Sequence, residues 1–217
     1  MSPTDKPKDL RVITFTRNMV EFGTRVPRSM MTHEDRSVED DIQDPPPAQL
    51  VLVKFLRRPL LASIKLKALY QFVDEVFSYS KGLVACHSGC AACCHMPVEM
   101  YQVEADNIAA HAGRRAIRLK RDRAFEPAWV DRNRGCPFLR NNTCSIYEQR
   151  PLTCRMHFNF DATPAMCNES IAEPNRSKIP LLDRSRLFPA ILVEYLAFAG
   201  RHGKRGDIRH FFPSEDK

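Results

Sequence analysis

The stretch that decides the fold is Cys86-His87-Ser88-Gly89-Cys90-Ala91-Ala92-Cys93-Cys94-His95, in which four of the eight cysteines fall close together. The other four follow at larger intervals, at Cys136, Cys144, Cys154 and Cys167. Thiolate ligands select zinc, copper(I), iron or an iron-sulfur cluster, whereas magnesium and calcium prefer oxygen ligands. The sequence therefore predicts a region of irregular backbone that is organised by a metal centre.

Eight cysteines can form structural disulfides, remain free buried thiols, or bind a metal or cluster. Residues 1–10 contain Asp5, Lys6 and Lys8 where a secretory signal peptide requires an apolar run. We therefore expect a cytoplasmic protein, and structural disulfides are rare in that reducing compartment. Metal or cluster ligation is then the best account of the cysteines.

The spacing within the first group indicates how its cysteines divide their roles. Cys90 and Cys93 have the separation that lets two sulfurs bind one ion, and Gly89 permits the tight bend before them. Cys93 and Cys94 are neighbours whose side chains diverge, so we expect them to serve different roles. Eight sulfurs are compatible with two four-cysteine sites, one four-cysteine cluster with spare thiols, or a binuclear site.

The later cysteines are too far apart in the sequence to form a metal knuckle, so the fold must bring them to the first group. Three histidines, His87, His95 and His157, lie near cysteines, but eight sulfurs already saturate two tetrahedral ions. We expect these histidines to lie at the surface or beside the site. The candidate metal ligands are the eight cysteines, Cys86, Cys90, Cys93, Cys94, Cys136, Cys144, Cys154 and Cys167.

The charge of the chain gives only weak information about partners. Thirty-three Lys and Arg against 26 Asp and Glu make the formal net charge +7, which weakly favours an acidic protein partner. Residues 114–123 hold six of the positive side chains, and we expect them to form a solvated helix face. No aromatic residue is interleaved to stack on bases, so nucleic acid is not the expected partner. No apolar run is long enough for a membrane helix.

Hydrophobic periodicity predicts a mainly α fold, a small helical domain with an irregular cysteine-rich centre and at most a short β-hairpin. We expect one helix that begins at Pro59 and is capped by Gly82, further helices over residues 97–112 and 181–200, and two very short strands around Asn141-Asn142. Residues 1–47 are predicted to be a flexible tail ending in Pro45-Pro46-Pro47, with one short strand near residues 11–15. Residues 48–217 are predicted to form a single domain whose last residues, 201–217, are frayed.

The cysteine pattern resembles a known family. The segments Cys86 to Cys94, Cys136-Pro137-Phe138-Leu139 and Cys144-Ser145-Ile146-Tyr147-Glu148-Gln149-Arg150-Pro151-Leu152-Thr153-Cys154-Arg155 are similar to the bacterial YkgJ-type cysteine-cluster proteins. That family is described as a zinc- or iron-chelating domain and shares its motif with flagellin lysine N-methylases. The resemblance covers residues 83–170, including Cys167.

The resemblance implies metal chelation by these cysteines, with an iron-sulfur cluster favoured over zinc or iron because the methylases of this motif are thought to carry one. The methylase activity itself is not expected, since the chain lacks a Gly-rich strand-to-helix turn for a nucleotide-like methyl donor. Three hypotheses follow: a cysteine-ligated iron-sulfur or iron protein with a redox role, a zinc-stabilised interaction module, and a metal-handling protein without catalysis. No catalytic residue is assigned.

Overall fold

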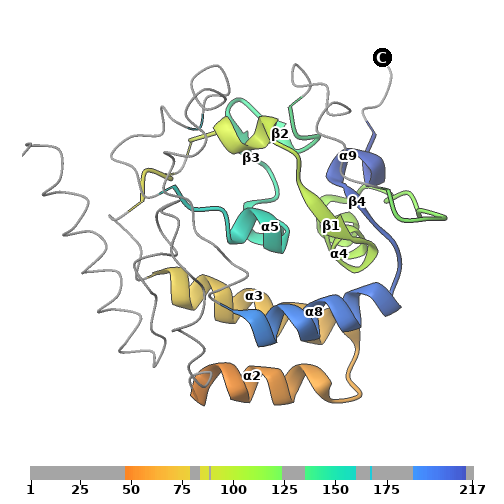
Figure 1. Cartoon of the computed structure of the whole chain (residues 1–217). Helices are drawn as coiled ribbons and strands as arrows, with labels where there is room; N and C mark the ends of the chain where they lie inside the picture. Colours follow the sequence, from red (N-terminus) through yellow and green to blue (C-terminus); the bar gives the residue numbers. More distant parts are fainter. Residues whose placement is uncertain are drawn as a thin grey trace, which may run out of the picture. The chain divides into compact units, whose positions relative to one another are not determined.

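The computed structural model describes residues 47–78, 84–87, 89–123, 135–159, 167 and 188–213 (Figure 1). The strand expected near residues 11–15, the helix cap expected at Gly82 and residues 181–187 of the last expected helix lie outside the described residues. The chain divides into two compact units. Unit 1 comprises Met1–Arg58, Gln71–His87 and Met156–Glu194, and unit 2 comprises Pro59–Tyr70, Ser88–Arg155 and Tyr195–Lys217. The division into a tail and a single domain 48–217 stays a prediction.

Unit 1 is built from α2 (Pro47–Arg57), residues 71–78 of α3 (Ala62–Ser78) and the start of α8 (Pro189–Arg201). Phe77 stacks on Phe158 with ring centroids 4.3 Å apart and meets Phe188 edge-on. Arg57 of α2 pairs with Glu194 of α8 at 2.7 Å. The buried core residues are apolar: Leu52, Val53, Leu56, Val73, Val76, Phe77, Phe188 and Ile191.

The sequence predicts α3 well and misses α2. Apolar residues at intervals of three and four give α3 its buried stripe, which includes Leu66, Leu69, Val73 and Val76. The prolines before α2 mark a boundary, but Pro47 belongs to the helix. Proline is tolerated in a first helical turn because its missing N–H has no partner there.

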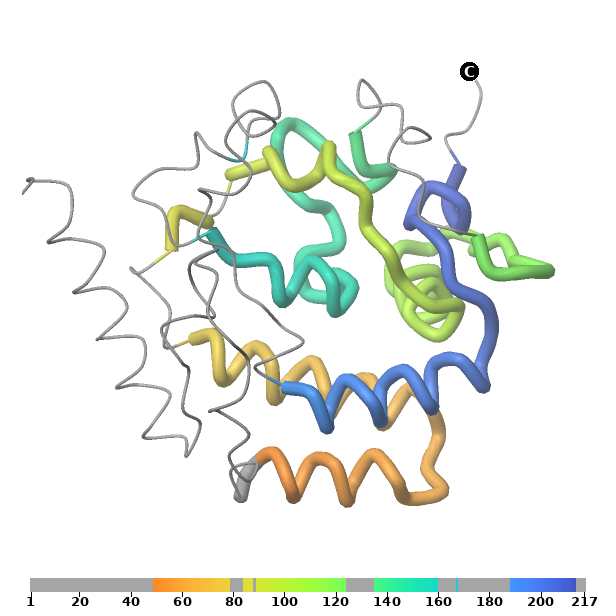
Figure 2. The backbone as a smooth tube through the Cα atoms, viewed as in Figure 1, coloured from red at the N-terminus to blue at the C-terminus, as the bar shows by residue number. Residues whose placement is uncertain are grey.

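Unit 2 is centred on a small antiparallel sheet in which β1 (Glu99–Tyr101) pairs with β4 (Arg205–Asp207), Glu99 facing Asp207. Figure 2 shows these two segments, from distant parts of the sequence, running side by side. β1 leads into α4 (Gln102–Ala112) and β4 into α9 (Ile208–Phe211). Their apolar side chains form one buried cluster: Val98, Met100, Ala105, Ile108, Phe138, Ile146, Ile208, Phe211 and Phe212.

A second two-stranded sheet confirms the predicted hairpin. β2 (Leu139–Arg140) pairs with β3 (Thr143–Cys144), and Leu139 faces Cys144. Asn141 and Asn142 have φ of 47° and 57°, the positive values that a two-residue hairpin turn requires and that asparagine tolerates. The mainly α fold class with short hairpins is confirmed.

The expected start of the helix at residue 97 is wrong. Residues 99–101 form β1, and α4 begins only at Gln102. Pairing with β4 satisfies the backbone before the helix, and the Glu104 side chain accepts the N–H of Tyr101 at 3.3 Å. The predicted end is right, since Gly113 follows the helix with a left-handed φ of 63°.

The segment 114–123 is not a helix, in contrast to the prediction from its composition. Its backbone donates to other elements instead, from Ile117 to Phe211 O at 2.9 Å and from Arg123 to Arg205 O at 2.9 Å. The prediction that residues 201–217 are frayed is wrong for residues 205–211, because β4 and α9 are packed against the unit 2 core; residues 214–217 lie outside the described residues. Tertiary contacts here outweigh local preference.

Among the described helices, none is long and apolar enough to cross a membrane.

Candidate metal centre

Cys93 and Cys94 of the first cysteine group lie in a turn of 3-10 helix in unit 2, η3 (Ala92–His95). The N–H of Cys94 donates to Ala91 O at 2.9 Å, and that of Met96 to Cys93 O at 3.1 Å. Gly89, just before this turn, has φ of 86°, a conformation that other residues rarely adopt. The tight bend predicted for this glycine is therefore confirmed.

The later cysteine segment is bonded directly to the first. The N–H of Cys136 donates to the carbonyl oxygen of Cys94 at 2.7 Å. Arg209 of α9 donates to the same carbonyl at 3.3 Å and pairs with Asp207 at 3.1 Å. Asp207 in turn accepts the N–H of Val98 at 2.7 Å. Asp207 of β4 and Arg209 of α9 thus support the backbone that carries Cys94.

Cys144 and Cys154 reach the same region from the hairpin and from α5 (Leu152–Arg155). Together with Cys136, they pack against the buried apolar cluster of unit 2. Burial raises the pKa of the Cys136 thiol to about 11 and raises those of Cys144 and Cys154 as well. These thiols are therefore neutral at physiological pH in the absence of a cation.

Five thiols of unit 2 shift one another's pKa through electrostatic interactions: Cys93, Cys94, Cys136, Cys144 and Cys154. A hydrogen bond from the Cys94 thiol lowers the pKa of Cys93 to about 7 and raises that of Cys94. A negative charge on Cys93 would raise the pKa of both Cys144 and Cys154. The sequence predicts that the fold brings the two cysteine segments together, and in unit 2 they are neighbours.

Cys86 and Cys167 belong to unit 1, where they lie along the segment that follows α5. The Cys86 thiol faces His157 O at 4.0 Å, and Asn159 Nδ2 donates to the Cys167 sulfur at 3.2 Å. The N–H of Ala85 also donates to Asn159 O at 2.8 Å. Cys90 belongs to unit 2 and is half-buried.

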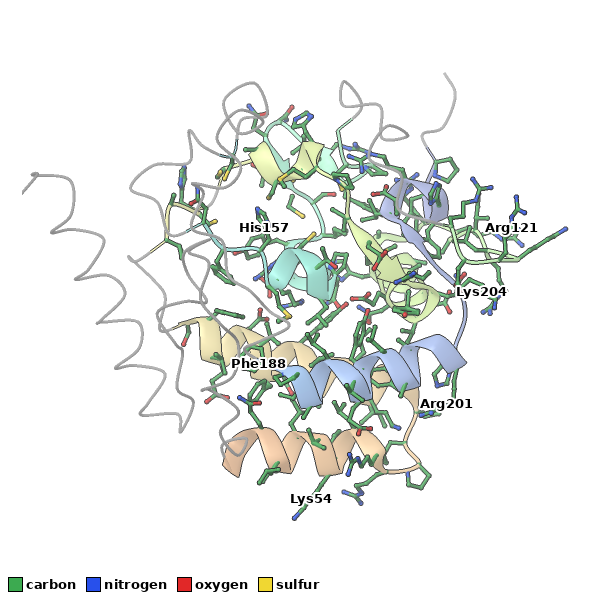
Figure 3. All side chains as sticks on the ribbon, in the orientation of Figure 1. Lys54, Arg121, His157, Phe188, Arg201 and Lys204 are labelled. Atoms are coloured by element: carbon green, nitrogen blue, oxygen red, sulfur yellow. The ribbon has the colours of Figure 1, made fainter. Side chains whose placement is uncertain are left out.

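None of the eight cysteines, all of which lie in the described part of the chain, forms a disulfide, and Figure 3 draws their sulfurs in yellow. Within the described residues, no three His, Cys, Asp or Glu side chains converge closely enough to hold one metal ion. The thiols of unit 2 are therefore neighbours without being arranged as a closed coordination shell. That all eight cysteines are metal ligands stays a prediction.

The histidines near the cysteines occupy different surroundings. His87 is exposed, with its Nδ1 2.9 Å from Ala85 O. His95 lies against Gly135, where an added Cβ would come within 3.3 Å of its ring. His157, labelled in Figure 3, is half-buried in unit 1. Their expected role beside the metal rather than on it stays a prediction.

Two arginines of the motif have separate functions in the structure. The positive charge of Arg150 adds to the effect of the Cys94 hydrogen bond in lowering the pKa of Cys93, and it partly offsets the rise that burial causes in the pKa of Cys144. Its guanidinium stacks on Tyr147 at 3.9 Å. Arg155 is buried and donates to the carbonyl oxygens of Arg150 and Glu148. Arg150 therefore acts on the thiols, whereas Arg155 supports the turn that carries Cys154.

Sequence reasoning missed the buried carboxylate of Glu104 and the ion pair of Asp207 with Arg209. Glu104 is completely buried, between Val103 and Ala105 on α4. An acid within the predicted apolar stripe of that helix is the signal that would have pointed to it. The ion pair lies in residues expected to be frayed, where no periodicity indicates structure.

Residues 85–168 match the model of a family named CxxCxxCC, described as "Putative zinc- or iron-chelating domain". The matched residues include all eight cysteines, and the description of the family model supports metal binding. No curated protein and no solved structure is significantly similar to the chain.

Proposed function

We propose that the chain chelates an iron-sulfur cluster through its cysteines. The observation that carries the proposal is that both cysteine segments lie together in unit 2, where the N–H of Cys136 donates to Cys94 O at 2.7 Å and Cys136, Cys144 and Cys154 pack on one apolar cluster. Cys93 and Cys94 come from η3, Cys136 and Cys144 from the hairpin region, and Cys154 from α5. A soft cation is the ligand that such a donor set selects.

The chemistry of these thiols fits a metal. The hydrogen bond to Cys93 raises the pKa of Cys94, and burial raises the pKa of Cys144 and Cys154, while repulsion between neighbouring thiolates adds to the rise in all three. A bound cation reverses that repulsion, because it attracts every thiolate at once. Metal binding would require the thiols to converge, since no three of them do so within the described residues.

The number of thiols favours a centre with more than one metal atom. A structural zinc ion takes four ligands, whereas five thiols in unit 2 already exceed that number. Cys90 lies three residues before Cys93 in unit 2, whereas Cys86 and Cys167 belong to unit 1; all eight cysteines stay proposed as metal ligands. A cysteine-ligated iron-sulfur cluster would supply electron transfer, and we propose a redox role for it.

Anaerobic purification followed by elemental analysis and visible absorption tests the identity of the metal. A brown protein with iron and acid-labile sulfide supports the cluster, whereas bound zinc without colour contradicts it and favours the zinc-stabilised module. Metal that exchanges quickly with a chelator while the fold persists favours metal handling. Cys90→Ser and Cys93→Ser are each expected to lower the metal bound per chain, and Tyr147→Phe, at an exposed position, is the control.

We also propose the cytoplasm as the compartment, because thiolate ligands persist in a reducing environment.

An acidic protein partner is proposed for the basic segment 114–123. Arg115, Lys120 and Arg121 are exposed, and hydrogen bonds to unit 2 hold the backbone of this segment. In Figure 3, Arg121 and Lys204 project from segments that are hydrogen-bonded through Arg205. Salt-sensitive binding of an acidic peptide, lost in Arg115→Glu with Arg121→Glu, tests this proposal.

A further inference from the structure

α5 is a turn of four residues, Leu152 to Arg155, and three of them are anchored to other parts of unit 2. The N–H of Leu152 donates to Glu104 Oε1 at 2.8 Å. The hydroxyl of Thr153 donates to Glu99 O at 2.6 Å. The guanidinium of Arg155 lies 4.0 Å from the ring centre of Tyr70. The remaining residue is Cys154, which packs with Cys136 and Cys144 against the buried apolar cluster of unit 2.

Glu104 is held from several sides. Its carboxylate accepts hydrogen bonds from the hydroxyl of Tyr70 on α3, at 2.8 Å, and from that of Tyr195 on α8. It also accepts the N–H of Leu152 on α5 and of Tyr101 before α4. The side chain has no exposed surface. One carboxylate therefore joins four elements of unit 2, and only α5 carries a cysteine.

Burying a carboxylate is costly, and packing alone does not explain it. An aliphatic side chain of the same length would fill the space without the loss of hydration that an acid suffers. An aliphatic side chain has no hydrogen-bond acceptor. The Glu104 carboxylate, held by the two tyrosine hydroxyls, accepts the N–H of Leu152, two residues before Cys154. Polar groups that orient ligand-bearing segments often determine metal affinity as strongly as the ligands themselves.

We propose that Glu104 is a positioning residue that holds Cys154 at the metal centre, acting through the N–H of Leu152. This inference rests on the proposed function. Tyr70 and Tyr195 fix the carboxylate, and the carboxylate fixes the start of α5. Loss of the acceptor frees the turn, so that Cys154 no longer meets the other thiols with the orientation that a shared metal requires.

Anaerobic titration with Co²⁺ tests the proposal, because thiolate-to-Co²⁺ absorption reports both affinity and ligand geometry. Glu104→Leu removes the acceptor and is expected to weaken Co²⁺ binding about 10- to 100-fold and to alter the spectrum. Glu104→Gln keeps a carbonyl oxygen for Leu152 and is expected to restore most of the affinity. Asp106→Asn, on the exposed side of the same helix, is the matched control and should behave like the wild type.

A metal-free readout separates this proposal from the proposed function. Iodoacetamide labelling of the folded chain, mapped by mass spectrometry, is expected to modify Cys154 faster in Glu104→Leu while Cys144 reacts at its wild-type rate. If the wild type takes up no Co²⁺, the proposed function fails, and the labelling rates still decide the positioning role. Wild-type affinity, spectrum and labelling in Glu104→Leu would overturn the proposal.

A variant without the acceptor can also fail to fold, which near-ultraviolet circular dichroism would reveal. In that case Tyr70→Phe combined with Tyr195→Phe provides the test, because both rings remain and only the hydroxyl donors are lost. The double variant is expected to weaken Co²⁺ binding several-fold. Unchanged affinity together with an unchanged spectrum would overturn the proposal equally.

Discussion

The N–H of Cys136 donates to the carbonyl oxygen of Cys94 at 2.7 Å, which joins the two cysteine segments by a main-chain hydrogen bond. The same carbonyl accepts Arg209 at 3.3 Å. The backbone of the proposed metal centre is therefore assembled by contacts that do not involve sulfur. This arrangement explains how thiols from distant parts of the sequence can be neighbours before a metal binds.

Removing Arg209 is expected to loosen this assembly. Arg209→Met leaves Asp207 as an unpaired carboxylate whose side chain is only 5% exposed, at a cost of about 3 kcal/mol in the free energy of unfolding. Arg205→Met is the matched control, because its pair with Glu99 at 3.5 Å has side chains 42% and 33% exposed and contributes less than about 1 kcal/mol. Urea unfolding of the metal-free chain measures both. Equal losses in the two variants would contradict the role given to Arg209.

Gly203 is expected to tolerate no side chain. A Cβ at this position would lie 2.4 Å from Cβ of Gln102, and its φ of 143° is rarely adopted by other residues. Gly203→Ala is therefore expected to destabilise the chain by about 2–3 kcal/mol or to shift α4 away from β4. Gly113→Ala provides the comparison, since its φ of 63° is strained but no atom lies within 4 Å of the added Cβ. A smaller loss for Gly203→Ala than for Gly113→Ala, in thermal unfolding, would refute this prediction.

Glu104 makes the stability of the metal-free chain depend on pH. Burial is the main cause that raises its pKa in the folded state, although its hydrogen bonds lower it. The folded chain then binds more protons than the unfolded chain above about pH 4.5, so this group's contribution to stability falls as pH rises through the raised pKa. Glu104→Gln is expected to remove that decline. The difference in unfolding free energy between wild type and variant, measured from pH 4 to pH 8, should change with pH, and a constant difference would argue against the buried acid.

The local parts of the fold could be predicted from the sequence, because local chemistry specifies them. The stripe of α3, the left-handed Gly113 and the Asn141-Asn142 turn each depend on neighbouring residues alone. The pairing of β1 with β4 could not be predicted, since three-residue strands carry too little periodicity and their partners are far apart in the sequence. That pairing also explains why residues 205–211 are ordered rather than frayed, and why residues 114–123, which are hydrogen-bonded to β4 through Arg123, are not helical.

The candidate site shows the same division. The cysteines and their soft-metal chemistry could be read from residue type and spacing, and the family model supports metal binding. The sequence could not predict that five thiols group together in unit 2, nor that Glu104 is buried. Both depend on which elements meet in three dimensions. A lone acid on a helix is usually solvated, and only the two tyrosines and the Leu152 N–H distinguish this one.

The most direct test is whether one cysteine from each segment serves the same centre. Metal bound per chain should be measured for Cys93→Ser, for Cys136→Ser and for the chain that carries both substitutions, each purified anaerobically. If both sulfurs share a centre, each single variant loses its metal and the double variant loses no more than either. Independent losses that add in the double variant, or full metal content in both single variants, would contradict a shared centre.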